Sequence, residues 1–144
     1  MTPNLQMTET SMKRRSQSRS EYQEAMLNKA LDLRDAGDFP QALELLRDLT
    51  TDAPDDLDSL FYYGTILFHL DRYQEATEVF HKFLEHRPKN EPASLALFLS
   101  LWHLGRRREA GAEMKRFMAL SDSREYSRLL SEIEEAWNAD QDIE

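Results

Sequence analysis

The sequence has no cysteine among its 144 residues, and it has only four glycines and five prolines. The absence of cysteine excludes disulfide bonds and thiolate metal sites. So few glycines leave little scope for a glycine-rich phosphate-binding loop. No run approaches the roughly eighteen apolar residues of a membrane-spanning helix, and the first thirty residues or so contain no apolar signal core. We therefore expect a soluble, cytoplasmic protein with no membrane partner.

Basic side chains are also scarce, because 27 acidic residues face 18 basic ones and the formal net charge is −9. The first twenty residues hold a single acidic residue and four basic ones, namely Glu9 against Lys13, Arg14, Arg15 and Arg19. The remaining 124 residues therefore carry a net charge of −12. A surface of this charge repels a polyanion, so we expect no nucleic-acid partner. The polar composition of residues 1–20 predicts a disordered basic leader, and residues 140–144 an acidic tail.

The chain contains an internal repeat of 34 residues. Alignment of the sequence with itself at this offset shows three copies of one unit. Four aligned positions are Gly37 with Asp71 and Gly105, Ala42 with Ala76 and Ala110, Leu46 with Phe80 and Met114, and Leu49 with Phe83 and Phe117. A period of roughly 20 to 50 residues is typical of stacked helical units that cover one another's apolar faces. With 40% apolar residues, the chain can build such a core.

Apolar residues at steps of three and four predict two helices in each unit. We expect helices from Glu21 to before Gly37, from Pro40 to before Pro54, and over Leu57–His69, Tyr73–His86, Pro92–Leu104 and Arg108–Leu120. Gly37 offers the left-handed residue with which a helix commonly ends. A last amphipathic helix over 123–139 is predicted to cover the end of the third unit with one apolar stripe: Tyr126, Leu129, Leu130, Ile133 and Trp137.

This pattern resembles the tetratricopeptide repeat. Repeats are expected over 23–56, 57–90 and 91–124. The second matches best, through Leu60, Tyr63, Gly64 and Leu67 in its first helix and Tyr73, Ala76, Phe80 and Pro88 in its second. The third departs from the pattern, with Phe98 at a position for a small residue and Asp122 in place of proline. The resemblance implies an all-α protein, an α-solenoid of three helix-turn-helix repeats with a C-terminal capping helix, in one domain over 21–139.

In this family the first helix of each repeat forms the concave wall, and extended peptides commonly lie along it. The resemblance therefore implies a partner-binding groove lined by Leu27, Leu31, Phe61, Tyr62, Thr65, Phe68, His69, Leu95, Leu99, Trp102 and His103. Only Asn28 and Arg34 on this wall could donate to a terminal carboxylate, so we reject a carboxylate clamp. An exposed strip of such aromatic residues is typical of a binding site, although an apolar stripe can also pack helix against helix.

The leading hypothesis is thus a small adaptor or chaperone that holds a peptide or helix of another protein in an apolar concave groove. Self-association through the same groove, giving a homo-oligomeric scaffold, is an alternative hypothesis. A second alternative is an acidic, immunity-type partner that neutralises a basic protein by charge. Fold-level resemblance does not choose among the three.

The other residue patterns do not predict a catalytic or metal-binding site. No nucleophile has a base at a suitable spacing, so we expect no enzyme and no cofactor. His81 and His86 diverge on a helix, and His69 and His103 lie on separate helices, so no metal site is expected. The acidic run from Asp52 to Asp58 lacks the glycine and glutamate of a calcium loop and fits helix capping better. Arg106, Arg107 and Arg108, with Lys115 and Arg116, form a basic patch that is either a solvated turn or a site for an acidic segment.

Overall fold

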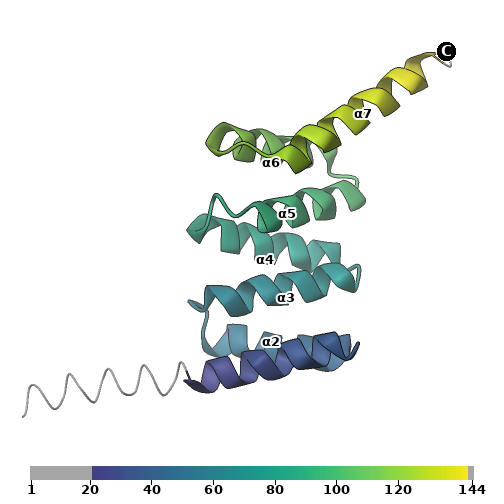
Figure 1. The fold of residues 1–144 in the computed structure, drawn as a ribbon. Coiled ribbons are helices and arrows are strands. Elements are labelled where there is room, and N and C mark those ends of the chain that lie inside the picture. Colours follow the sequence, from purple (N-terminus) through teal and green to yellow (C-terminus); the bar gives the residue numbers. More distant parts are fainter. Residues whose placement is uncertain (1–20, 143–144) are drawn as a thin grey trace, which may run out of the picture. The chain divides into compact units, whose positions relative to one another are not determined.

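The computed structural model describes residues 21–142, and every regular element in that range is a helix. A helix over 21–35 comes first, followed by α2 (Phe39–Asp52), α3 (Leu57–His69), α4 (Tyr73–His86), α5 (Glu91–His103), α6 (Arg107–Leu120) and α7 (Arg124–Asp142) (Figure 1). The predicted all-α helical-repeat class is confirmed. The leader predicted over 1–20 lies outside the described residues, as do residues 143–144 and the side chains of Trp137 and of 140–142.

One type of turn recurs every 34 residues. Gly37 has a φ of +83°, Gly105 a φ of +77°, and Asp71, at the equivalent position, a φ of +59°. At each turn two backbone bonds close the preceding helix, as where Gly37 N–H donates to the Arg34 carbonyl at 2.9 Å and Asp38 N–H to the Leu33 carbonyl at 2.8 Å. This is the Schellman arrangement, which requires a left-handed residue and so favours glycine. The 34-residue repeat of the sequence is therefore also a repeat of the backbone conformation.

Side-chain caps fix the starts of α2 and α5, whereas α4 and α6 begin without a side-chain cap bond. The Asp38 carboxylate accepts from Gln41 N–H at 3.2 Å, and the Asn90 side chain accepts from Ala93 N–H at 2.9 Å. Proline in the first turn follows both caps, where its missing N–H costs nothing. Helices α3 and α4 have the predicted bounds. Helices α2, α5 and α6 each begin one residue earlier than predicted, and α5 also ends one residue earlier. Helix α7 continues to Asp142 and so includes residues that we expected in an acidic tail.

The chain divides after Ile66 into two compact units. In the first unit, the core is built from small and aliphatic side chains, and Arg47 of α2 donates to the Tyr63 hydroxyl of α3 at 3.4 Å. Its fully or nearly fully buried residues include Ala30, Ala42, Leu46, Leu49 and Leu60. In the second unit, α5 packs against both α4 and α6 and is apolar on all sides, as expected for a helix enclosed by neighbours.

Ala76 on α4 tests the packing of the second unit. Its side chain is completely buried, so a larger residue has no solvent-facing direction in which to turn. We expect Ala76→Leu to lower the free energy of unfolding by about 1 to 3 kcal/mol through overpacking. Urea denaturation followed by circular dichroism measures this, with Glu78→Leu on the exposed side of the same helix as the control. An unchanged midpoint for Ala76→Leu would contradict the 34-residue register.

Helix α7 is anchored through its first turn. Tyr126 is fully buried, whereas Leu129 and Ile133 are half-buried and Leu130 is 39% exposed. Beyond Tyr126, no side chain of α7 that the structure describes is buried, and Figure 1 shows α7 extending past α6. The expectation of a continuous apolar stripe covering the last repeat therefore holds only for the start of the helix. Among residues 21–142, no helix has the length and apolar content needed to cross a bilayer.

Candidate functional site

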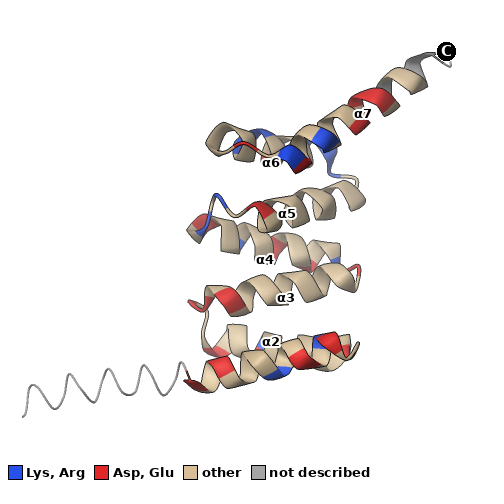
Figure 2. Cartoon of the chain, in the orientation of Figure 1, with Lys and Arg blue, Asp and Glu red and all other residues tan. Residues whose placement is uncertain are grey.

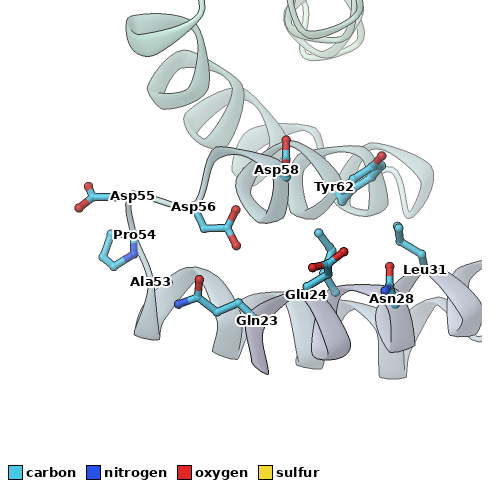
Figure 3. Close-up of a pocket in the computed structure, with 11 residues that line it drawn as sticks. Gln23, Glu24, Asn28, Leu31, Ala53, Pro54, Asp55, Asp56, Asp58 and Tyr62 are labelled. Atoms are coloured by element: carbon cyan, nitrogen blue, oxygen red, sulfur yellow. The ribbon is translucent and has the colours of Figure 1, made fainter. Parts of the chain in front are cut away.

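The first unit contains a pocket of about 790 Å³. Its walls come from the helix over 21–35, from the loop before α3 and from the first turns of α3 (Figure 3). The lining residues are Gln23, Glu24, Leu27, Asn28, Leu31, Ala53, Pro54, Asp55, Asp56, Asp58 and Tyr62. Because residues 24, 27, 28 and 31 follow a helical spacing, one face of the first helix supplies most of one wall.

Three of the predicted groove residues meet in this pocket, namely Leu27, Leu31 and Tyr62, and all three are half-buried. The Tyr62 ring makes an edge contact with Phe61, with ring centroids 5.5 Å apart. The Arg34 guanidinium lies 5.7 Å from the centre of the Tyr62 ring, a cation–π distance. Phe61 thus supports the pocket without lining it. Thr65 also does not line it, and its hydroxyl donates to the Tyr62 carbonyl at 2.8 Å.

Four carboxylates surround the pocket: Glu24, Asp55, Asp56 and Asp58. Asp56 accepts from Ser59 N–H at 3.4 Å and from the Ser59 hydroxyl at 2.8 Å, so the capping role predicted for this run is confirmed at Asp56. Within residues 21–142, none of the four forms an ion pair, and no lysine or arginine lines the pocket. The apolar groove inferred from sequence therefore has an acidic rim. The sequence contained a sign of this rim at Glu24, which lies three residues before Leu27 and seven before Leu31. This spacing places all three on one face of a helix.

The groove residues predicted in the second unit are largely occupied by contacts within it. Trp102 stacks on Phe98 with centroids 5.8 Å apart, and the Arg107 guanidinium lies 4.4 Å from the centre of the indole. His103 stacks on Tyr73 at 4.5 Å with an interplanar angle of 4°. Phe68 meets the same Tyr73 edge-on at 5.5 Å. Tyr73 is thus the centre of an aromatic cluster that the sequence interpretation did not assign to the site.

The remaining predicted residues occupy separate positions. Leu95 and Leu99 are half-buried on α5, and His69 is exposed at the end of α3. Among the residues that the structure describes, no three histidine or carboxylate side chains are grouped so as to hold a metal ion.

The basic patch is divided among contacts within the second unit. Arg106 pairs with Glu109 and also donates to the Gln74 side chain at 3.4 Å, while Arg107 covers Trp102. Arg116 pairs with Glu113 at 2.6 Å. Side chains of this patch thus link α6 to its neighbours.

A buried polar network joins α5, α6 and α7. The Ser94 hydroxyl donates to a Glu113 carboxylate oxygen at 2.5 Å and lies 2.6 Å from the Tyr126 hydroxyl. Arg116 donates to both Glu113 oxygens, at 2.7 and 2.6 Å, and to the Pro88 carbonyl at 3.0 Å. Ser94 and Tyr126 are fully buried and Glu113 is 7% exposed. Because the buried carboxylate is paired and hydrogen-bonded, the network avoids the cost of an isolated buried charge.

Burial raises the pKa of Tyr126 above its ordinary value of 10.0, and the nearby Glu113 carboxylate acts in the same direction. The folded state therefore holds this proton more tightly than the unfolded chain does. The stability contributed by the neutral hydroxyl is complete below pH 10 and is lost as the pH rises above it. We expect the unfolding free energy to fall by up to about 1.4 kcal/mol per pH unit above pH 10. Tyr126→Phe should remove this component, and equal slopes for the two proteins in pH-dependent denaturation would contradict it.

Comparison of the sequence with known protein families finds one match. A sequence model of the tetratricopeptide repeat matches residues 27–91. Residues 27–91 carry tetratricopeptide repeats. That match contains most of the residues that line the pocket, and the fold is a protein-interaction repeat that is not enzymatic in itself.

Solved structures show the same fold. MamA of MSR-1 is 26% identical to this chain, with a TM-score of 0.64 over 68% of this chain and 56% of that one. MamA of AMB-1 is also 26% identical, with a TM-score of 0.65 over 68% of this chain and 54% of that one. MamA of Desulfovibrio magneticus RS-1 is 17% identical, with a TM-score of 0.64 over 69% and 56%, and shows the fold alone. This chain thus spans little more than half of these relatives' length. No curated protein matches it significantly.

Proposed function

We propose that this tetratricopeptide-repeat protein is a cytoplasmic adaptor or chaperone that holds a peptide or helix of another protein in the pocket of its first unit. The observation that carries the proposal is the convergence of Leu27, Leu31 and Tyr62 on one pocket of about 790 Å³. The resemblance to the tetratricopeptide repeat implies the same residues as part of the binding wall. The volume lies within the roughly 300 to 1,000 Å³ of typical ligand sites.

The lining chemistry supports a peptide ligand. Half-buried leucine and tyrosine side chains supply contact area that a partner can bury. Gln23 and Asn28 add side-chain amides, which both donate to and accept from a peptide backbone. No reacting group is needed for this role, and none is proposed.

Photo-crosslinking from a single position tests the proposal. A benzophenone amino acid at position 62 faces the pocket, whereas one at position 81 lies on the exposed side of α4. We expect irradiation in the native host to join position 62, and not position 81, to a discrete second protein. Equal or absent crosslinking at both positions would contradict the assignment of the pocket.

Self-association is a second candidate, favoured by apolar residues at the end of the second unit. Met118 is 36% exposed, Leu120 44% and Leu130 39%. Large apolar side chains left exposed are candidate interface residues. Light scattering of the wild type and of Leu120→Glu/Leu130→Glu tests this, with the equally apolar Leu104→Glu as the control. A monomeric wild type would exclude it.

A further inference from the structure

The acidic pocket lies directly after a basic segment of the same chain. Residues 13–19 contain Lys13, Arg14, Arg15 and Arg19, and the pocket begins at Gln23. We propose that residues 13–19 bind in the pocket of the first unit of their own chain and thereby compete with the partner. This inference rests on the proposed function, because it takes the pocket to be the binding site.

Charge complementarity selects this occupant. Glu24, Asp55 and Asp58 line the pocket, and within residues 21–142 none of them forms an ion pair. Figure 2 shows acidic residues at the start of α3. Like charges gathered at one concave site favour the entry of a cation, because each added positive charge relieves their mutual repulsion.

The apolar part of the pocket fits the same occupant. Lysine and arginine have long aliphatic stems that pack on apolar surface while their charged heads reach carboxylates. Leu27 and Leu31 offer that surface. The Tyr62 ring already accepts the Arg34 guanidinium on one face at 5.7 Å, so it suits a second cation.

The tether makes binding within one chain feasible. Residues 16–20 can span up to about 17 Å when extended. The helical stretch from Glu24 to Leu31 covers only about 10 Å. Arg14 and Arg15 can therefore reach the part of the pocket that this helix lines. A short tether gives an effective concentration in the millimolar range, which favours the chain's own segment over a second copy. Because the carboxylates are accessible to solvent and screened by salt, a tighter partner can displace the segment.

Carbodiimide crosslinking tests the contact in the full-length protein. Lys13 is the only lysine in residues 1–20, and a carbodiimide joins its amine to a carboxylate in direct contact. We expect a link from Lys13 to the peptide that contains Asp55, Asp56 and Asp58, lost at high salt and in Asp55→Asn/Asp58→Asn. Mixing copies labelled with ¹⁴N and ¹⁵N distinguishes a link within one chain from a link between two copies. Links within one isotope support the proposal, whereas mixed-isotope links, or links chiefly to Glu132 and Glu134 of α7, overturn it.

A competition experiment tests the inhibitory consequence. The probe is a fluorescent synthetic peptide with the sequence of residues 11–20. We expect full-length Arg14→Glu/Arg15→Glu to bind this peptide about tenfold or more tighter than the wild type, because its pocket is no longer filled. The matched control is Arg87→Glu/Lys89→Glu, which makes the same charge change on an exposed turn and should bind as the wild type does.

Two results of this competition overturn the inference. Equal affinity of Arg14→Glu/Arg15→Glu and the wild type means that the segment does not fill the pocket. Absence of peptide binding to either protein means that the pocket accepts no basic segment. Neither result would affect the crosslink from position 62 to a second protein, so the failure of this inference is distinguishable from failure of the proposed function.

Discussion

Tyr126→Ala is expected to lower the free energy of unfolding by about 3 to 5 kcal/mol, the range for deleting a buried aromatic ring. The ring is fully buried and packs against Phe98 at 5.7 Å and Phe117 at 5.6 Å. It also anchors the start of α7 to α5 and α6. Removing it leaves a cavity between aromatic neighbours that cannot collapse without moving a helix. Denaturant unfolding followed by circular dichroism measures the change.

Tyr126→Phe is the matched control for this substitution. It keeps the ring and removes only the hydroxyl 2.6 Å from Ser94. We expect it to cost about 0.5 to 1.5 kcal/mol, because the Ser94 hydroxyl keeps its bond to Glu113. Tyr22→Ala, at a position 61% exposed, should change stability by less than about 0.5 kcal/mol. A cost for Tyr126→Ala no larger than that of Tyr126→Phe would contradict the anchoring role of the ring.

The second large effect is on binding. Leu31→Ala with Tyr62→Ala is expected to weaken the affinity for the captured partner by about 100-fold or more, as truncation of two hot-spot residues typically does. Both side chains line the pocket and are only half-buried, so helicity should stay close to that of the wild type. Isothermal titration calorimetry with the partner identified by crosslinking measures the loss.

A matched double variant shows whether that loss is specific. Leu95→Ala with Leu99→Ala removes two half-buried side chains from α5 in the second unit. We expect it to leave the affinity within about threefold of the wild type, a change of less than about 1 kcal/mol. If both double variants lose affinity equally, the binding site extends beyond the first unit and the pocket alone does not explain it.

The helices could be predicted from sequence because their boundaries are local. The caps at Asp38 and Asn90 and the left-handed turns at Gly37 and Gly105 are each determined by a few adjacent residues. The repeat then supplied the position of the third such turn at Asp71, although a non-glycine residue adopts the left-handed conformation there. Local signals and periodicity agree along this chain, which is why the fold class followed from them.

The polar network could not be predicted in the same way. Ser94 lies 19 residues from Glu113 and 32 residues from Tyr126, and serine and glutamate are residue types that usually face solvent. Only the packing of α5, α6 and α7 reveals that the three meet. The packing of Phe98 also could not be predicted. The repeat has a small residue at this position, so the pattern gives no neighbour for a large ring, whereas the structure places Phe98 against Tyr126.

The candidate site was predicted in part. The resemblance to the tetratricopeptide repeat implied that Leu27, Leu31 and Tyr62 lie on one wall, and the structure places all three at the pocket. The resemblance did not identify the acidic rim, because an aspartate before a helix is equally well explained as a cap. Asp56 is such a cap, whereas Asp55 and Asp58 line the pocket without a capping bond among the described residues.

The central claim is that the pocket of the first unit binds a segment of another protein. Nuclear magnetic resonance shift mapping tests it most directly, by titrating ¹⁵N-labelled full-length protein with the partner segment identified by crosslinking. The account predicts that the largest amide shift changes fall in residues 23–31 and 53–62, which contain the pocket lining. Shift changes confined to α6 and α7 would contradict it and assign binding to the end of the second unit.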